Sequence, residues 1–158
     1  MRKVILGIDI DGVFNVIDMD DVPNDINKTP VKYLNGILEA VPSCDVLIVS
    51  SWGNRDNHTV ECLVEAEFKY PNRVVGCTDN ILDSRTEATH LWMNKHKEYC
   101  DIVCLDDEIA LYDYSGNENK NGASKRDVVE CRPDRGLDID KAYETICRLQ
   151  GVNLRFWS

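Results

Sequence analysis

The chain has 158 residues, of which 43% are hydrophobic, 8% aromatic and 29% charged, and its net charge at pH 7 is −10. This composition is typical of a folded protein and excludes collagen-like, coiled-coil and wholly disordered chains. The acidic balance argues against tight non-specific binding of nucleic acid, because neutralising phosphates requires clustered lysines and arginines. The length favours one domain over residues 1–158. No apolar run approaches the roughly 20 residues of a membrane-spanning helix, so we expect a cytoplasmic protein without a membrane partner.

Five short apolar segments along the chain are predicted to form β-strands. They are rich in valine, isoleucine, leucine and cysteine, and apolar and polar residues alternate little within them. This pattern is typical of strands that are buried on both faces of a parallel sheet. The five segments are Lys3–Asp9, Asp45–Ser50, Arg73–Gly76, Asp101–Leu105 and Asp127–Cys131.

Helical patterns separate most of these strands. Thr29 is expected to cap a first helix, and a second helix is expected over residues 60–68. A capping-box pattern at Ser84 opens a third helix, and a fourth begins near Asp138. The residues that the fourth helix is expected to bury are Ile139, Ala142, Tyr143, Ile146 and Leu149.

Strands that alternate with helices predict an α/β protein, a three-layer, Rossmann-like, doubly wound parallel sheet of about five strands. Residues 152–157 are expected to add a sixth strand or an extended strap. Ligands of such sheets bind beyond the carboxyl ends of the strands. Functional side chains are therefore expected directly after each strand.

Acidic residues follow two of the predicted strands. Asp9 and Asp11 stand at the end of the first, where Gly12 lets the chain turn sharply. These two carboxylates can reach the same space, one as a nucleophile and the other as an acid/base, unless the segment is a plain acidic loop. The run 106–108 (Asp-Asp-Glu) follows the fourth strand, either as an acid-rich helix start or as a site for Mg²⁺.

Hydroxyl and cationic side chains stand at other element ends. Ser50 and Ser51 follow the second strand, where a hydroxyl and backbone N–H groups can hold a phosphoryl oxygen. Trp52, beside them, either stacks on a base or packs against the protein. Arg85 opens a helix, where the helix dipole disfavours a cation, so it is expected to face an anion. The alternative cations are Arg55 and Lys95.

The seven cysteines are odd in number and contain no CxxC pair. The apolar neighbours of most of them favour buried, reduced thiols over disulfides. A structural zinc site is disfavoured, because closely paired ligands are missing.

The motifs together resemble those of the haloacid dehalogenase (HAD) superfamily of phosphatases. Asp9–Val13 matches its first motif, D-x-D-G-[TV], and Val46–Ser50 matches a strand that ends in Ser or Thr. Arg85 matches the basic residue of the third motif, and the pair at Asp106 and Asp107 matches the fourth.

A closer likeness is to the small HAD domains of Swiss-army-knife RNA-repair proteins. The Arg that those domains usually carry directly after the tryptophan is absent, since Gly53 stands there and Arg55 follows two residues later. The segments that carry the likeness are Asp9–Asn15, Val49–Trp52, Val75–Thr78, Arg85–Trp92 and Ile102–Glu108.

The resemblance implies a HAD core without a large cap and a role for each matched residue. Asp9 would attack phosphorus and become an aspartyl-phosphate, and Asp11 would protonate the leaving oxygen and then activate water. Ser50 and Arg85 would bind the phosphoryl oxygens. The residues that would hold Mg²⁺ are Asp9, Asp11 through its backbone region, and Asp106 or Asp107. Further substrate contacts would come from Gly12, Ser51, Trp52 and Arg55.

The spacing leaves only Phe14–Lys28 for a short flap, so an open site is expected. By the same resemblance, open sites serve large substrates such as nucleic-acid ends. A group of basic residues offers either a small anion-binding patch or merely a solvated loop. These residues are Lys120, Lys125, Arg126, Arg132 and Arg135.

The leading hypothesis is a Mg²⁺-dependent phosphomonoesterase acting on nucleotides or on terminal phosphates of nucleic acid. One alternative is phosphate transfer to an acceptor other than water, and another is a phosphatase of small non-nucleotide esters. A third is a binding or regulatory module that keeps the fold without chemistry.

Overall fold

The computed structural model describes residues 2–16, 26–53, 57–79, 84–116, 118–119 and 121–151. The β-strands are β1 (Lys3–Ile8), β2 (Cys44–Ile48), β3 (Val74–Cys77), β4 (Tyr99–Asp106) and β5 (Val128–Glu130). The α-helices are α1 (Lys28–Ala40), α2 (His58–Glu65), α3 (Arg85–Lys95) and α4 (Ile139–Leu149). The short 3₁₀ helices are η2 (Pro71–Arg73), η3 (Ile109–Leu111) and η4 (Lys125–Asp127).

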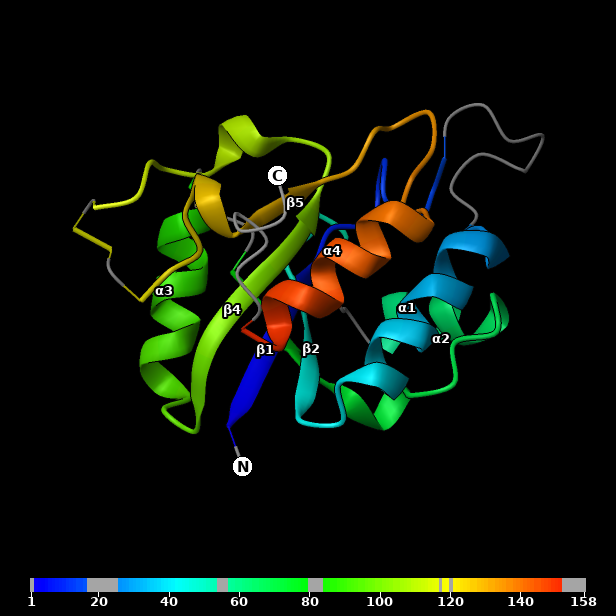
Figure 1. Cartoon of the computed structure of the whole chain (residues 1–158), viewed down its shortest axis with the longest axis horizontal. Coiled ribbons are helices and arrows are strands. Elements are labelled where there is room, and N and C mark those ends of the chain that lie inside the picture. The colour runs from blue at the N-terminus through cyan, green and yellow to red at the C-terminus, as the bar shows by residue number, and fades with distance from the viewer. Residues whose placement is uncertain are drawn as a thin grey trace.

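The strands form one all-parallel sheet in the order β3-β2-β1-β4-β5. Helices lie on both faces, with α1, α2 and α4 sharing one hydrophobic core and α3 packing in a second core on the opposite face (Figure 1). The prediction of a doubly wound, three-layer α/β sheet is confirmed. All five predicted strands are present, and their ends agree with the prediction to within two residues.

The central strand β1 explains why the strands are apolar throughout. Val4, Leu6 and Ile8 face the core shared with α1 and α4, whereas Ile5 faces the core of α3. Because both faces of the strand are covered, alternation with polar residues is absent, as expected for a parallel sheet.

The start of α1 differs from the prediction, because the N-cap is Asn27 rather than Thr29. The Asn27 side chain does not cap the helix but accepts a hydrogen bond from the Val16 N–H at 2.7 Å. The Asn27 N–H in turn donates to the Phe14 carbonyl at 2.7 Å. These bonds join the two sides of the predicted flap at its base, and residues 17–25 of that flap lie outside the described residues.

The prediction for α4 was right about its start and partly wrong about its buried face. The Asp138 side chain caps the helix by accepting from the Lys141 N–H at 2.9 Å. Ile139 and Tyr143, expected to be buried, are 65% and 67% exposed. Ala142 and Leu149 are buried as predicted, together with Cys147 and with Thr145, whose hydroxyl donates to the Lys141 carbonyl.

All seven cysteines are free thiols, and Cys44, Cys104, Cys131 and Cys147 are buried as expected. Cys62 is half-buried, and Cys77 and Cys100 are exposed, so the expected burial holds for four of the seven. The tail at residues 152–158, predicted as a strand or strap, lies outside the described residues. Among the helices that the structure describes, none combines the length and the apolarity needed to cross a membrane.

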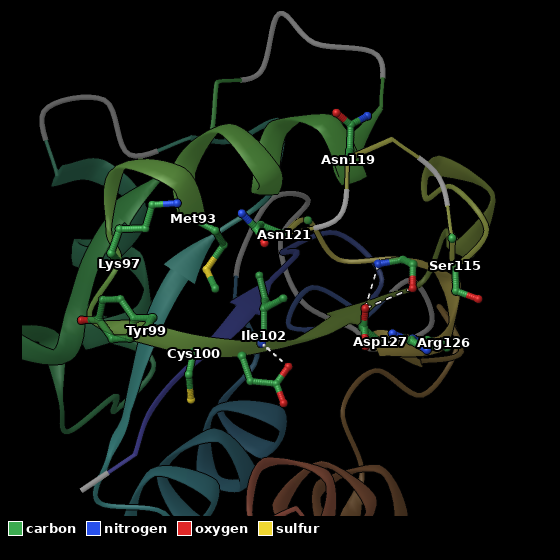
Figure 2. A pocket seen from close by; sticks show the side chains of 14 residues that line it. Met93, Lys97, Tyr99, Cys100, Ile102, Ser115, Asn119, Asn121, Arg126 and Asp127 are labelled. Atoms are coloured by element: carbon green, nitrogen blue, oxygen red, sulfur yellow. Dashed lines mark hydrogen bonds and ion pairs between the residues drawn. The ribbon is translucent and has the colours of Figure 1, made fainter.

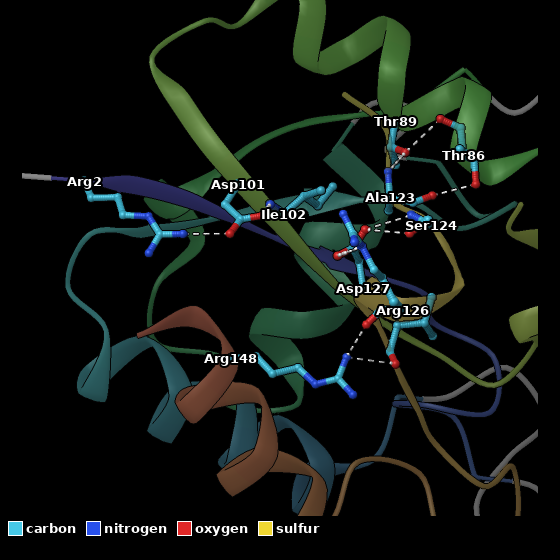
Figure 3. A network of polar contacts seen from close by, with 11 residues as sticks. Arg2, Thr86, Thr89, Asp101, Ile102, Ala123, Ser124, Arg126, Asp127 and Arg148 are labelled. Atoms are coloured by element: carbon cyan, nitrogen blue, oxygen red, sulfur yellow. Dashed lines mark hydrogen bonds and ion pairs between the residues drawn. The ribbon is translucent and has the colours of Figure 1, made fainter. Parts of the chain in front are cut away.

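Charged side chains partly cover the edge of β4 that faces away from β1. Among the described strands, β5 pairs only with residues 104–106 of β4, so the first half of β4 has β1 as its single neighbour. The Ile102 N–H there donates to the Asp101 carboxylate at 2.9 Å, and Asp101 is paired with Arg2 at 2.7 Å (Figure 3).

Candidate active site

The acidic residues predicted from the strand ends meet at the carboxyl edge of the sheet, between β1 and β4. Asp9 follows β1 directly, and its N–H donates to the Leu105 carbonyl at 2.9 Å. Asp106 ends β4, and Asp107 follows it. One carboxylate oxygen from each of Asp9, Asp106 and Asp107 lies within 4.8 Å of the other two, and we name these residues the acidic cluster. Chain order reverses between β1 and β4, which is where such sheets bind ligands.

Arg85 brings a positive charge to the acidic cluster. It is the first residue of α3, which Ser84 caps by accepting from the Glu87 N–H, as the capping-box pattern predicted. The guanidinium pairs with Asp9 at 3.4 Å and with Asp106 at a shorter distance. Lys95 ends α3, about 15 Å along the helix from Arg85, and Arg55 lies outside the described residues.

The charges of the cluster perturb one another. Burial and the neighbouring charge of Asp106 raise the pKa of Asp9 from 3.8 to about 8, although Arg85 opposes this shift. Burial also raises the pKa of Asp107, which is hydrogen bonded to Asp9. Burial alone would lower the pKa of Arg85, but Asp9 and Asp106 raise it above its ordinary value. The guanidinium therefore stays charged, while Asp9 keeps its proton to a higher pH than an ordinary aspartate does.

Asp106 is the most tightly held member of the acidic cluster, with no exposed surface. Its Oδ1 accepts the Glu108 N–H at 3.0 Å, and its Oδ2 accepts the Tyr112 hydroxyl at 2.8 Å. Oδ2 also accepts the Arg85 guanidinium. The acid-rich helix start considered for 106–108 is not what forms, since only the 3₁₀ helix η3 follows, from Ile109.

Gly12 allows the turn after Asp9 to pack against the cluster. Its φ is +78°, in the region that favours glycine, and a Cβ there would overlap the Asp107 carboxylate. The glycine is therefore required both by the backbone conformation and by the space that Asp107 occupies.

Asp11 is exposed and is not a member of the acidic cluster. Its Oδ1 accepts the indole N–H of Trp52 at 3.1 Å, and the Trp52 ring stacks on His58 with 6.4 Å between ring centroids. The predicted acid/base is therefore held by the loop after β2. Trp52 packs against the hydrophobic core, which was one of the two alternatives expected for it, and its indole N–H binds Asp11 in addition.

Ser50 and Ser51 stand at the same sheet edge as Asp9, because β2 is the neighbour of β1 and the Val49 N–H donates to Ile8 at 2.8 Å. Ser50 is buried, and its hydroxyl accepts the Trp52 N–H at 3.2 Å. Ser51 is exposed. The geometry keeps both hydroxyls as candidates for the phosphoryl oxygens.

Two members of the predicted basic patch are engaged elsewhere. Lys125 donates to the carbonyls of Ile109 and Tyr112, and Arg132 pairs with Asp134 at 2.8 Å. Arg126, Arg132 and Arg135 are all exposed, and Arg126 pairs with Asp127 at 4.0 Å, while Lys120 lies outside the described residues.

A hollow of about 440 Å³ lies away from the acidic cluster (Figure 2). It is bounded by the end of α3, the first half of β4 and the loop that leads to η4, with Lys97, Tyr99, Asn121 and Arg126 among its lining. None of the predicted site residues lines it.

Sequence patterns missed Tyr112 and Thr86. Tyr112 is 1% exposed and contacts Asp106, and Thr86 is fully buried and binds the loop after η3. The available signal was one of two tyrosines in an acidic segment, Tyr112 beside Tyr114, and a threonine beside Arg85. Neither pattern specifies a contact, because the partners come from other elements.

Residues 5–142 match the family model described as the HAD domain in Swiss Army Knife RNA repair proteins. The matched range contains the acidic cluster, Asp11, Ser50 and Arg85. No curated protein and no solved structure matches the chain significantly.

Proposed function

Because the chain belongs to the family of HAD domains in Swiss Army Knife RNA repair proteins, a family that indicates a phosphatase-like hydrolase, we propose that it is a Mg²⁺-dependent phosphomonoesterase. The observation that carries the proposal is the acidic cluster with Arg85 at the β1–β4 edge. Its substrates are nucleotides or terminal phosphates of nucleic acid.

The acidic cluster suits a hard divalent cation. Three carboxylates, when ionised, carry three negative charges, and Arg85 supplies one positive charge, so a charge of −2 remains to be balanced. Mg²⁺ prefers oxygen ligands and commonly binds through one or two carboxylates together with substrate phosphate. Asp9, Asp106 and Asp107 would hold the ion, with the backbone at Asp11. When bound, Mg²⁺ neutralises charge on the carboxylates and on the phosphoryl group.

Hydrolysis would proceed in two displacements at phosphorus. Asp9 attacks the phosphorus, and the bond to the ester oxygen breaks as Asp11 gives that oxygen a proton, leaving an aspartyl-phosphate. Asp11 then takes a proton from water, whose oxygen attacks the same phosphorus and releases Asp9 and inorganic phosphate. Arg85 and a hydroxyl from Ser50 or Ser51 bind the phosphoryl oxygens through both steps.

The family description favours RNA ends among the possible substrates. The members of this family are domains of RNA repair proteins, and repair of broken RNA requires termini with the correct phosphorylation. The chain's net charge of −10 leaves little general attraction for RNA. Recognition would therefore rest on the terminal phosphate itself rather than on a long basic surface.

The test is release of phosphate from 3′-phosphorylated RNA, 5′-phosphorylated RNA and mononucleotides, each with Mg²⁺ and with EDTA. Asp9→Asn is expected to abolish release, and Asp134→Asn, which changes an exposed aspartate on the surface, is the matched control. The component that is consumed separates RNA-end repair from nucleotide metabolism. Wild-type turnover in Asp9→Asn, or release that is unchanged by EDTA, would contradict the proposal.

A further inference from the structure

Tyr112 contacts the acidic cluster from inside the protein. Its side chain is 1% exposed, and its hydroxyl donates to Asp106 Oδ2 at 2.8 Å. Arg85 donates to the same oxygen, and the Glu108 N–H donates to Oδ1 at 3.0 Å. Asp106 therefore receives one donor on Oδ1 and two on Oδ2.

The donors fix how Asp106 can bind a cation. A carboxylate offers about four lone-pair directions, two on each oxygen. With two donors on Oδ2 and one on Oδ1, the direction that remains for a metal ion is on Oδ1. Without the phenol, Oδ2 would keep only the Arg85 donor, and its second lone-pair direction would compete for the ion in another geometry.

The backbone around Tyr112 is held in place by residues from other elements. The Lys125 ammonium donates to the Tyr112 carbonyl and, at 3.3 Å, to the Ile109 carbonyl. The next residue, Asp113, donates its N–H to Thr86 Oγ1 at 2.8 Å and accepts from the Ser84 hydroxyl at 3.2 Å.

The same helix end that carries Arg85 thus anchors the loop that carries Tyr112. Thr86 Oγ1 also donates to the Ala123 carbonyl, and Thr89 Oγ1 accepts the Ala123 N–H at 2.8 Å (Figure 3). Gly122 lies so close to the helix that a Cβ there would overlap the Thr86 carbonyl. Arg85 and Tyr112 are the two side chains that donate to Asp106. Both are therefore positioned by one hydrogen-bonded unit, the start of α3 and the loops packed against it.

We propose that Tyr112 is a positioning residue that orients Asp106 as a ligand of a divalent cation. The inference rests on the proposed function only in that the acidic cluster binds such an ion. Groups that orient metal ligands commonly account for 10- to 100-fold in metal affinity, and the buried phenol has this relation to Asp106.

The test is calorimetric titration of the substrate-free protein with MgCl₂, which needs no catalytic activity. Tyr112→Phe keeps the ring and removes the hydroxyl, and it is expected to weaken Mg²⁺ binding about 10- to 100-fold. The matched control is Tyr99→Phe, because Tyr99 is also buried and also donates to a carboxylate, Asp45, but at the opposite end of β4. This control is expected to keep wild-type affinity.

Thermal melting in EDTA establishes that each variant is folded. If Tyr112→Phe does not fold, Lys125→Met provides the test. This variant removes the ammonium that binds the Tyr112 carbonyl and leaves the phenol in place. A several-fold loss of Mg²⁺ affinity is then expected. Unchanged affinity in the folded variant, or an equal loss in Tyr99→Phe, would overturn the proposal. So would a wild-type protein that binds no Mg²⁺. A wild-type protein that binds Mg²⁺ but releases no phosphate would refute the proposed function alone.

Discussion

The free energy of unfolding of the metal-free protein is expected to fall between pH 5 and pH 8, and Asp9→Asn is expected to remove much of that fall. Burial and Asp106 raise the pKa of Asp9 from 3.8 to about 8 in the folded protein. Between these two values the unfolded chain has released the proton, while the folded protein still holds it. Raising the pH therefore favours unfolding, and the stabilisation that is fully present below pH 3.8 is lost by about pH 8.

The size of this effect follows from the shift. Where the folded and unfolded states differ by one bound proton, the free energy of unfolding changes by about 1.4 kcal/mol per pH unit. The three pH units between pH 5 and pH 8 therefore allow a fall of at most about 4 kcal/mol. Asp9 is only 4% exposed, so water screens its charge little. The amide in Asp9→Asn carries no charge at any pH. The stability of the variant relative to wild type should therefore rise by up to about 4 kcal/mol between pH 5 and pH 8.

Urea unfolding in EDTA, followed by circular dichroism across this pH range, measures the free energy of unfolding of both proteins. The difference between their curves separates Asp9 from other titrating groups, and Asp134→Asn serves as a control that should follow the wild type. Adding Mg²⁺ to the wild type is expected to remove most of the fall, because a bound cation favours ionised carboxylates. Parallel curves for wild type and Asp9→Asn in EDTA would refute the reasoning.

Two further changes test the geometry around the acidic cluster. Gly12→Ala should cost about 1–2 kcal/mol for its positive φ and should also weaken Mg²⁺ binding, because the new Cβ overlaps Asp107. Gly116→Ala, with φ +87° and open space around it, should lose similar stability and keep its Mg²⁺ affinity, and calorimetry on both variants checks the contrast. Trp52→Phe removes the donor to Asp11 and should lower kcat about tenfold, the equivalent of one lost bond to a charged group. Steady-state kinetics measures this change, and an unaltered kcat would show that the indole N–H plays no part.

The architecture and the positions of the acidic residues were predictable because both depend on local patterns. Apolar runs without alternation mark strands covered on both faces, and Asp9 and Asp106 stand where such runs end. Parallel strands end at one edge of the sheet, so these carboxylates had to come together. The capping pattern at Ser84 likewise fixed where α3 begins, and with it the place of Arg85.

The contacts that complete the site were not predictable, because they join elements that are distant along the chain. Lys125 looked like part of a surface patch, yet it donates to two carbonyls of the loop that carries Tyr112. The indole of Trp52 reaches Asp11 from the loop after β2, 41 residues away in sequence. The exposure of Ile139 was missed for a different, local reason: Thr145 can be buried in α4 because its hydroxyl donates to the Lys141 carbonyl of the same helix.

The charged covering on the outer edge of β4 bears on how the folded chain behaves among its own copies. An open strand edge is a template on which another molecule can add a strand, and repeated addition leads to aggregates. The Ile102 N–H already donates to the Asp101 carboxylate, and this carboxylate forms an ion pair with Arg2. An incoming strand would have to displace this ion pair and leave its charges against a backbone. The first half of β4 can therefore lack a second neighbouring strand without becoming a site where aggregates form.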